Sequence, residues 1–86
     1  MTKLDSMINI GKEFSKKLES VGIDCAEKLV ELGSKESFLR LKDVYPRICL
    51  VHLYALEGAI TNVPINYLSK ETRAELKKFC DMYKNF

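Results

Sequence analysis

The chain has 86 residues, of which 47% are hydrophobic and 30% are charged, and its 14 basic and 12 acidic residues give a formal net charge of +2. This composition excludes a disordered segment, and the length fits one domain, so we expect residues 1–86 to form a single helical domain. The charge is too small to identify a nucleic-acid-binding protein by itself.

The first two helices are expected on either side of a break at Asn9-Ile10-Gly11. Thr2 can cap a short first helix with Leu4 and Ile8 on one face. The second helix would bury the apolar residues at positions 14, 18 and 21, which recur at helical spacing. Gly22 would end it, because glycine adopts the left-handed conformation without a Cβ penalty.

Two shorter helices are expected next. Asp24 would open the first of them, with Glu27 three residues later as in a capping box, and Gly33 would end it. Ser34 would cap a short fourth helix that carries Phe38 on its apolar side.

The fifth segment, PRICLVHLYALEGAI, has only two charged residues, Arg47 and Glu57, between positions 46 and 60. A helix that is apolar on almost every side is buried, so this one is expected at the centre of the fold. Pro46 suits its first turn, where a missing N–H has no consequence, and Gly58 would let a neighbouring segment approach closely.

The last helix is expected after a turn at residues 62–64. Ser69 would cap it, and Leu76, Phe79 and Tyr83 would face inward. Six helical pieces with short loops predict a compact all-α domain.

The residues that could carry out chemistry are few. His52 and Glu57 lie five residues apart on one helix and do not share a face, and local spacing places no serine or cysteine near His52. No phosphate-binding loop, dinucleotide motif or zinc-protease motif is present. The sequence therefore predicts a protein that is not an enzyme, with no small-molecule substrate and no cofactor.

The three cysteines, Cys25, Cys49 and Cys80, form no C-x-x-C pair. With a single histidine they give no zinc-ligand pattern, so we expect small apolar core residues in a reducing compartment. The first ten residues lack the apolar core of a signal peptide, and no segment approaches the roughly 20 apolar residues of a membrane span. These features predict a cytoplasmic protein without a membrane partner.

The turn from Asn9 to Lys12 allows two interpretations. It can be only the corner between two packed helices, since asparagine and glycine both tolerate the left-handed conformation. It can also bind a phosphate, because a helix N-terminus presents unpaired N–H groups at the positive end of its dipole. The candidate nucleic-acid-binding residues are Asn9, Ile10, Gly11, Lys12, Lys16 and Lys17.

Several stretches of the chain resemble a known family. Residues 4–23, with the NIGK turn, resemble a helix-hairpin-helix motif and the start of the C-terminal domain of bacterial TfoX/Sxy competence regulators. The string LYALEGA at residues 53–59 is very similar to that family's central string, and the likeness extends to about Phe79. The resemblance implies a compact all-α bundle of five to six short helices, with an N-terminal helix-hairpin-helix-like unit around a buried central helix.

What the resemblance implies about function is a non-enzymatic regulatory module in a transcription or competence setting. DNA, held through its backbone, is one expected partner. The alternative is a protein-interaction domain that docks on a transcription regulator, on RNA polymerase or on a separate N-terminal partner. An exposed apolar patch would favour this alternative, and the candidates for it are Tyr45, Tyr67, Met82 and Phe86.

Overall fold

The computed structural model describes residues 1–83, and every regular element within them is helical, which confirms the expected all-α fold. Five α-helices are accompanied by two short 3-10 helices, η1 before α1 and η2 between α4 and α5. The elements are η1 (Leu4–Ser6), α1 (Lys12–Ser20), α2 (Ala26–Leu32), α3 (Ser34–Val44), α4 (Leu50–Thr61), η2 (Ile65–Tyr67) and α5 (Lys70–Met82).

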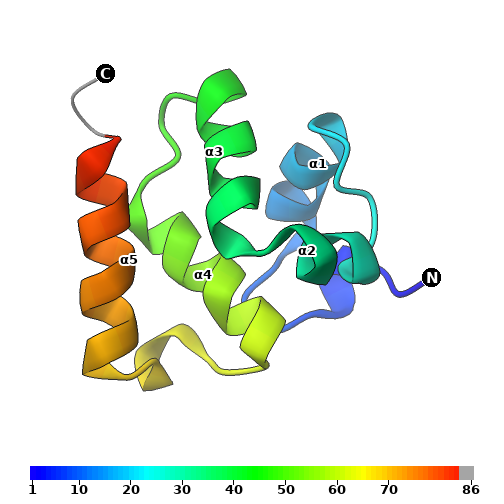
Figure 1. Ribbon diagram of the computed structural model, residues 1–86. Helices are drawn as coiled ribbons and strands as arrows, with labels where there is room; N and C mark the ends of the chain where they lie inside the picture. The colour runs from blue at the N-terminus through cyan, green and yellow to red at the C-terminus, as the bar shows by residue number, and fades with distance from the viewer. Residues whose placement is uncertain (84–86) are drawn as a thin grey trace.

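Helix α4 occupies the centre of the molecule, as its apolar composition predicts. It crosses between α5 on one side and α2 and α1 on the other, and it packs most extensively against α3 and α5 (Figure 1). Leu53 and Leu56 have no exposed surface, and both belong to a continuous core to which α1, α2, α3 and α5 each contribute. This core fixes where α1 and the loops around it lie.

The beginning of α4 differs from the expectation. Pro46 is not in its first turn, because the N–H of Ile48 donates to the carbonyl of Tyr45 (3.0 Å) and closes a turn around Pro46. Cys49 is extended and precedes the helix, which begins at Leu50. The helix is also not buried on every side, since Val51 is 59% exposed.

The N-terminal segment is less helical than expected. Only residues 4–6 form a 3-10 turn, in which Leu4 is buried, while Ile8 lies beyond the turn and is half-buried. Thr2 does not cap this turn. Its N–H and hydroxyl instead donate to the carboxylate of Glu27, over distances between 2.8 and 3.2 Å.

This contact explains why the capping box expected at Asp24 and Glu27 is absent. Helix α2 begins at Ala26, with Cys25 before it and no side-chain cap. The Glu27 carboxylate binds Thr2 instead of closing a capping box with Asp24. Hydrogen bonds from the Thr2 backbone, from the backbone of Glu27 itself and from the Thr2 side chain lower the pKa of Glu27 to about 2.

The glycine stops and the cap at Ser69 are confirmed, whereas the cap expected at Ser34 is not. Gly22 and Gly33 follow α1 and α2 with φ of 88° and 86°. Ser34 is the first residue of α3 rather than its cap, and its hydroxyl donates to Glu57 on α4 instead. Ser69 caps α5 as expected, accepting a hydrogen bond from the N–H of Thr72 (3.1 Å).

Of the three residues predicted to face inward from the last helix, Leu76 and Phe79 do so. Leu76 is buried, and the ring of Phe79 meets that of Phe38 edge-on, with centroids 6.4 Å apart. Tyr83, at the end of the helix, is 38% exposed. Within residues 1–83, no helix has the length and apolar character needed to cross a membrane.

Candidate nucleic-acid interface

The turn before α1 is held from inside the molecule. Asn9 has φ of 71°, in the left-handed region that asparagine tolerates. Its side-chain amide donates to the carbonyl of Val63 (3.0 Å) and accepts from the N–H of Ile65 (3.3 Å), both in the segment after α4. Ile10 is 5% exposed and belongs to the core. Asn9 and Ile10, two of the candidate residues, therefore direct their side chains inward.

The N-terminus of α1 is open. Gly11 is exposed and precedes the helix in an extended conformation (φ −92°, ψ −176°), with no side chain capping it. A Cβ added to Gly11 would have no atom within 4 Å. Among the described residues, no acceptor is found for the N–H groups of residues 11–14, whereas that of Ser15 donates to the Gly11 carbonyl (2.9 Å). These groups lie at the positive end of the helix dipole.

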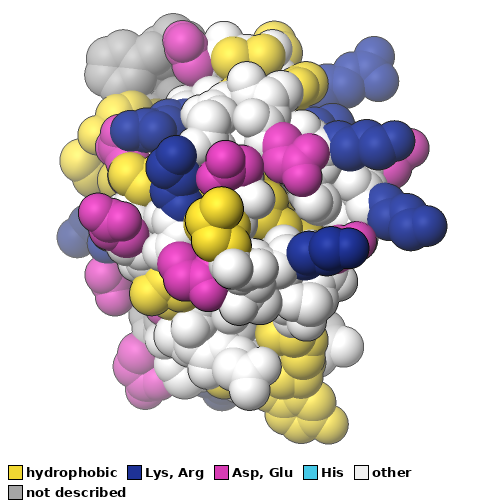
Figure 2. All heavy atoms as spheres, turned by 90° about the vertical axis from the view of Figure 1, so that its right-hand side faces the viewer, with side chains coloured by type: hydrophobic (Ala, Val, Ile, Leu, Met, Phe, Trp, Pro, Cys, Tyr) yellow, Lys and Arg dark blue, Asp and Glu magenta, His cyan; other side chains and the backbone are white. Residues whose placement is uncertain are grey.

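Two of the three candidate lysines stand free beside this terminus. Lys12 and Lys16 are exposed and lie one turn apart on α1, so their side chains share a face. Glu13 is the acidic residue of the first turn and opposes them. Figure 2 shows the side of the molecule on which α1 and α2 lie, where Lys and Arg side chains are most numerous along the right-hand edge of the view.

The third lysine belongs to a different feature. Lys17 is half-buried, and its ammonium group lies 5.5 Å from the centre of the Tyr45 ring. It lines a pocket of about 260 Å³ between α1 and the connection from α3 to α4. The pocket is lined by Lys17, Val44, Tyr45, Pro46, Arg47, Ile48 and His52. Sequence reasoning missed it, because Arg47 and His52 meet Lys17 only through the fold.

His52 is fixed on two sides. Its Nδ1 accepts a hydrogen bond from the N–H of Cys49 (3.1 Å), and its ring meets that of Phe14 edge-on at 5.4 Å. Burial lowers the pKa of His52 below its ordinary value, and the nearby charges of Lys17 and Lys42 lower it further. Two lysine charges therefore act on this ring.

The same region corrects two expectations about cysteine. The sulfur of Cys49 lies 3.5 Å from Nδ1 of His52, so a cysteine is placed beside the histidine, one helical turn before it. Cys49 is exposed because it precedes α4 rather than lying within it, and Cys80 is only partly buried. Cys25 alone is the core residue that was expected of all three.

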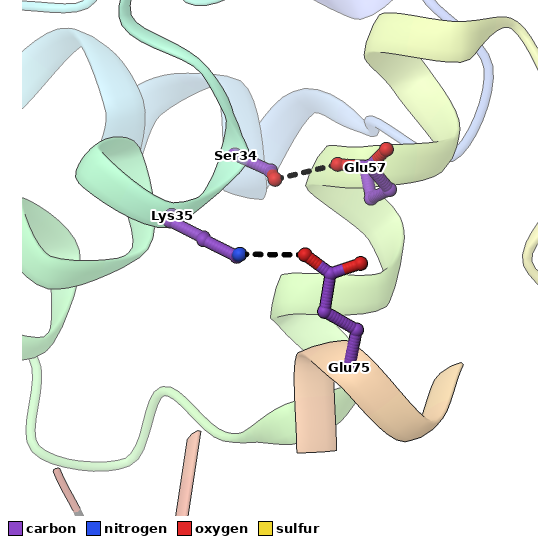
Figure 3. A network of polar contacts seen from close by, with 4 residues as sticks. All are labelled: Ser34, Lys35, Glu57 and Glu75. Carbon is purple, nitrogen blue, oxygen red and sulfur yellow. Dashed lines mark hydrogen bonds and ion pairs between the residues drawn. The ribbon is translucent and has the colours of Figure 1, made fainter. Parts of the chain in front are cut away.

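Glu57 serves a separate polar cluster. In Figure 3 its carboxylate accepts from the hydroxyl of Ser34 (2.6 Å), while Lys35 pairs with Glu75 on α5 (2.9 Å). Both pairs line a cleft of about 390 Å³ at the start of α3. They tie α3 to α4 and α5. His52 lines a different pocket, which is consistent with the prediction that His52 and Glu57 do not share a face of the helix.

The exposed apolar residues are spread over several elements. Tyr67 in η2 is 79% exposed and Met82 at the end of α5 is 62% exposed, whereas Tyr45 is half-buried. Phe86, the fourth candidate for an apolar patch, lies outside the described residues. Among residues 1–83, no group of three or more His, Cys, Asp or Glu side chains is placed to hold a metal ion.

The fold and this site define a small helical-bundle module with an uncapped helix terminus beside two exposed lysines. The family model of the TfoX C-terminal domain matches residues 1–80, and the chain belongs to this family. The resemblance noted in the NIGK turn and the LYALEGA string is thereby confirmed.

Two solved structures share the fold. A crystal structure of an uncharacterized protein from Listeria monocytogenes, in a triclinic form, is 37% identical over 94% of this chain and 92% of that chain, with a TM-score of 0.92. A crystal structure of a protein of unknown function from Listeria monocytogenes, in a tetragonal form, is 38% identical over 88% of this chain and 93% of that chain, with a TM-score of 0.85. No curated protein matches the chain.

Proposed function

We propose that this chain is a non-enzymatic regulatory module that binds the phosphate backbone of nucleic acid at the N-terminus of α1. The observation that carries the proposal is the open terminus itself. No side chain caps the first turn of α1, and the space around a Cβ built on Gly11 is open. Such a terminus favours an anion through both directed donors and the helix dipole.

The inward contacts of the turn support this interpretation rather than weaken it. Asn9 is bonded to the segment after α4, and Ile10 is anchored in the core, so the direction of α1 is fixed before any ligand arrives. A rigid donor set loses little conformational entropy on binding. The six candidate residues therefore have different roles. Asn9 and Ile10 position the terminus, and the exposed residues Gly11, Lys12 and Lys16 contact the phosphate. Lys17 belongs to the separate pocket.

Charge adds affinity but little sequence preference. Lys12 and Lys16 would pair with phosphates beside the one held by the N–H groups, while Glu13 offsets part of their charge. Contacts of this kind do not distinguish bases. A single terminus of this size should bind with a dissociation constant in the non-specific range of roughly 10⁻⁴ to 10⁻⁶ M at physiological salt. This role fits the cytoplasmic location expected from the sequence and, through the family, a setting in transcription or competence.

The proposal is tested with two substitutions at one position. Gly11→Asp would place a carboxylate where the phosphate is expected, and aspartate is also a favourable residue before a helix, so the fold is retained. Gly11→Ala adds only a methyl group in open space and is the matched control. We expect Gly11→Asp to abolish binding to duplex DNA, measured by fluorescence anisotropy, and Gly11→Ala to bind nearly as the parent does. Equal binding by both variants would contradict the proposal.

A second candidate function, docking on a protein, rests on Tyr67. This large side chain is 79% exposed in η2, a segment fixed by the Asn9 side chain. Exposed aromatic residues of this kind are frequent anchors of protein interfaces. Size-exclusion chromatography with purified RNA polymerase tests this function, with Tyr67→Ser as the variant. Co-elution that Tyr67→Ser removes would favour docking, and the absence of co-elution would exclude this partner.

A further inference from the structure

We infer that the pocket formed by Lys17, Arg47 and His52 is a binding site for a phosphate group, separate from the terminus of α1. The pocket has a volume of about 260 Å³ and lies where the connection from α3 to α4 crosses α1. Its lining contains the basic side chains of Lys17 and Arg47 and one imidazole, and no aspartate or glutamate. An anion entering it therefore meets charge of the opposite sign from two elements of the fold.

His52 supplies a directed donor. Because Nδ1 accepts the N–H of Cys49 (3.1 Å), the neutral ring carries its proton on Nε2. No partner for Nε2 is found among residues 1–83. A neutral imidazole held in this tautomer can donate one hydrogen bond to a phosphate oxygen, while Lys17 and Arg47 supply the charge.

The walls of the pocket are fixed in advance. The ammonium group of Lys42 donates to the carbonyls of Pro46 (2.9 Å) and Ile48 (2.6 Å), which holds the connection that carries Arg47. The hydroxyls of Tyr45 and Ser20 lie 2.6 Å apart and join this connection to α1. The ligand would therefore meet a formed site rather than a loop that must first be ordered.

The charges around His52 also favour an anion in the pocket. Lys17 on α1 and Lys42 on α3 both disfavour the charged form of His52, Arg47 shares its pocket, and the Cys49 sulfur lies beside its ring. An anion bound among these groups would offset the positive charge and favour imidazolium. Ligand binding should therefore raise the pKa of His52.

The source of the phosphate group is decided by experiment. Lys17 lies on α1, the helix whose N-terminus carries the proposed function, so a nucleic acid held there could place a second phosphate in the pocket. Free inorganic phosphate or pyrophosphate has the same chemistry. The inference requires only the phosphate group and does not rest on DNA binding.

His52 is the only histidine in the chain, so its ring signals in NMR report on this pocket without ambiguity. The imidazole is titrated alone, with inorganic phosphate, with pyrophosphate and with a short DNA duplex, and sodium chloride at matched ionic strength is the control. We expect at least one phosphate probe to raise the midpoint by about one pH unit, as an opposite charge at close range does. Arg47→Gln should weaken that binding roughly tenfold, through loss of one charge-assisted hydrogen bond. Lys78→Gln, on α5, should leave it unchanged.

The outcomes separate this inference from the proposed function. If phosphate or pyrophosphate raises the titration midpoint of His52 but DNA does not, the pocket is supported and nucleic acid is not its ligand. A shift with DNA whose binding Arg47→Gln weakens supports the pocket with a backbone phosphate as ligand. DNA binding with an unmoved His52 overturns the pocket while the proposed function stands. No shift with any probe, or an equal shift with chloride, also overturns it.

Discussion

The side-chain amide of Asn9 packs directly over Gly58 in the central helix. A Cβ built on Gly58 would overlap Nδ2 of Asn9 and the carbonyl oxygen of Val63. The NIGK turn and the LYALEGA string, which lie far apart in the sequence, therefore form one structural unit. The absence of a side chain at position 58 allows the hydrogen bonds that orient the N-terminus of α1.

Gly58→Ala is expected to destabilise the fold. The added methyl group meets a backbone carbonyl and a bonded amide, neither of which can move without losing the contact between Asn9 and Val63. Overpacking of this kind lowers the free energy of unfolding by about 1–3 kcal/mol. Urea denaturation measures the change, and Gly11→Ala is the control because its methyl group enters open space. Equal stability of the two variants would contradict the close packing of Asn9 and Val63 against Gly58.

Removal of the Asn9 side chain should have two separable effects. Asn9→Ala leaves the carbonyl of Val63 and the N–H of Ile65 without their partner and also puts alanine at φ of 71°. Loss of such a partner lowers the free energy of unfolding by about 1–3 kcal/mol. Asn9→Gly loses the same hydrogen bonds but tolerates the conformation, so it should be the less destabilised variant. The reverse order in denaturation experiments would mean that the backbone at this position relaxes.

The pairing of Thr2 with Glu27 predicts a distinct pH dependence. The carboxyl group has a pKa of about 2 in the folded chain, against 4.5 ordinarily. Because the folded state holds the ionised form, the contribution to stability is present above the ordinary pKa. It is lost as the pH falls from about 4.5 through about 2. NMR titration of the Glu27 side chain checks the pKa, and Glu27→Gln should remove this part of the acid dependence. A midpoint near 4.5 would contradict the observed hydrogen bonds.

The three cysteines should differ in reactivity. Cys49 is exposed beside His52 at the beginning of α4, Cys80 is partly buried and Cys25 is buried. Alkylation by iodoacetamide at neutral pH, followed by peptide mass spectrometry, should label Cys49 first and Cys25 last, because labelling of a buried thiol requires local opening. Labelling of Cys25 as fast as Cys49 would contradict the placement of α2 against the core.

The sequence predicted features that depend on near neighbours. Gly22 and Gly33 stop their helices through backbone conformation, and Ser69 caps through a residue three positions later. Two of the wrong predictions involve residues whose partners are distant in the sequence. Glu27 binds Thr2, and Ser34 binds Glu57. For each of these residues the sequence alone favours a local helix-capping role. Local patterns cannot decide between competing hydrogen-bond partners when the fold supplies the better one.

Some residues of the candidate site can likewise be predicted from local sequence, and others only from the fold. Gly11, Lys12 and Lys16 follow from a glycine before an amphipathic helix, and the structure leaves all three exposed. The inward direction of Asn9 and Ile10 depends on η2 and the core, so local spacing does not reveal it. The pocket of Lys17, Arg47 and His52 needs α1 and the connection after α3 to meet, and no motif in the sequence signals this.

The central claim is tested most directly by the salt dependence of DNA binding for the parent chain, for the double variant Lys12→Gln/Lys16→Gln and for Lys78→Gln. If both lysines contact phosphates, the double variant should weaken binding and reduce the slope of log K against log [salt] by about 1.8, which is roughly 0.9 for each lost phosphate contact. Lys78→Gln, on the far helix α5, should leave the slope unchanged. An unchanged slope in the double variant, or an equal loss in Lys78→Gln, would contradict a phosphate site at the N-terminus of α1.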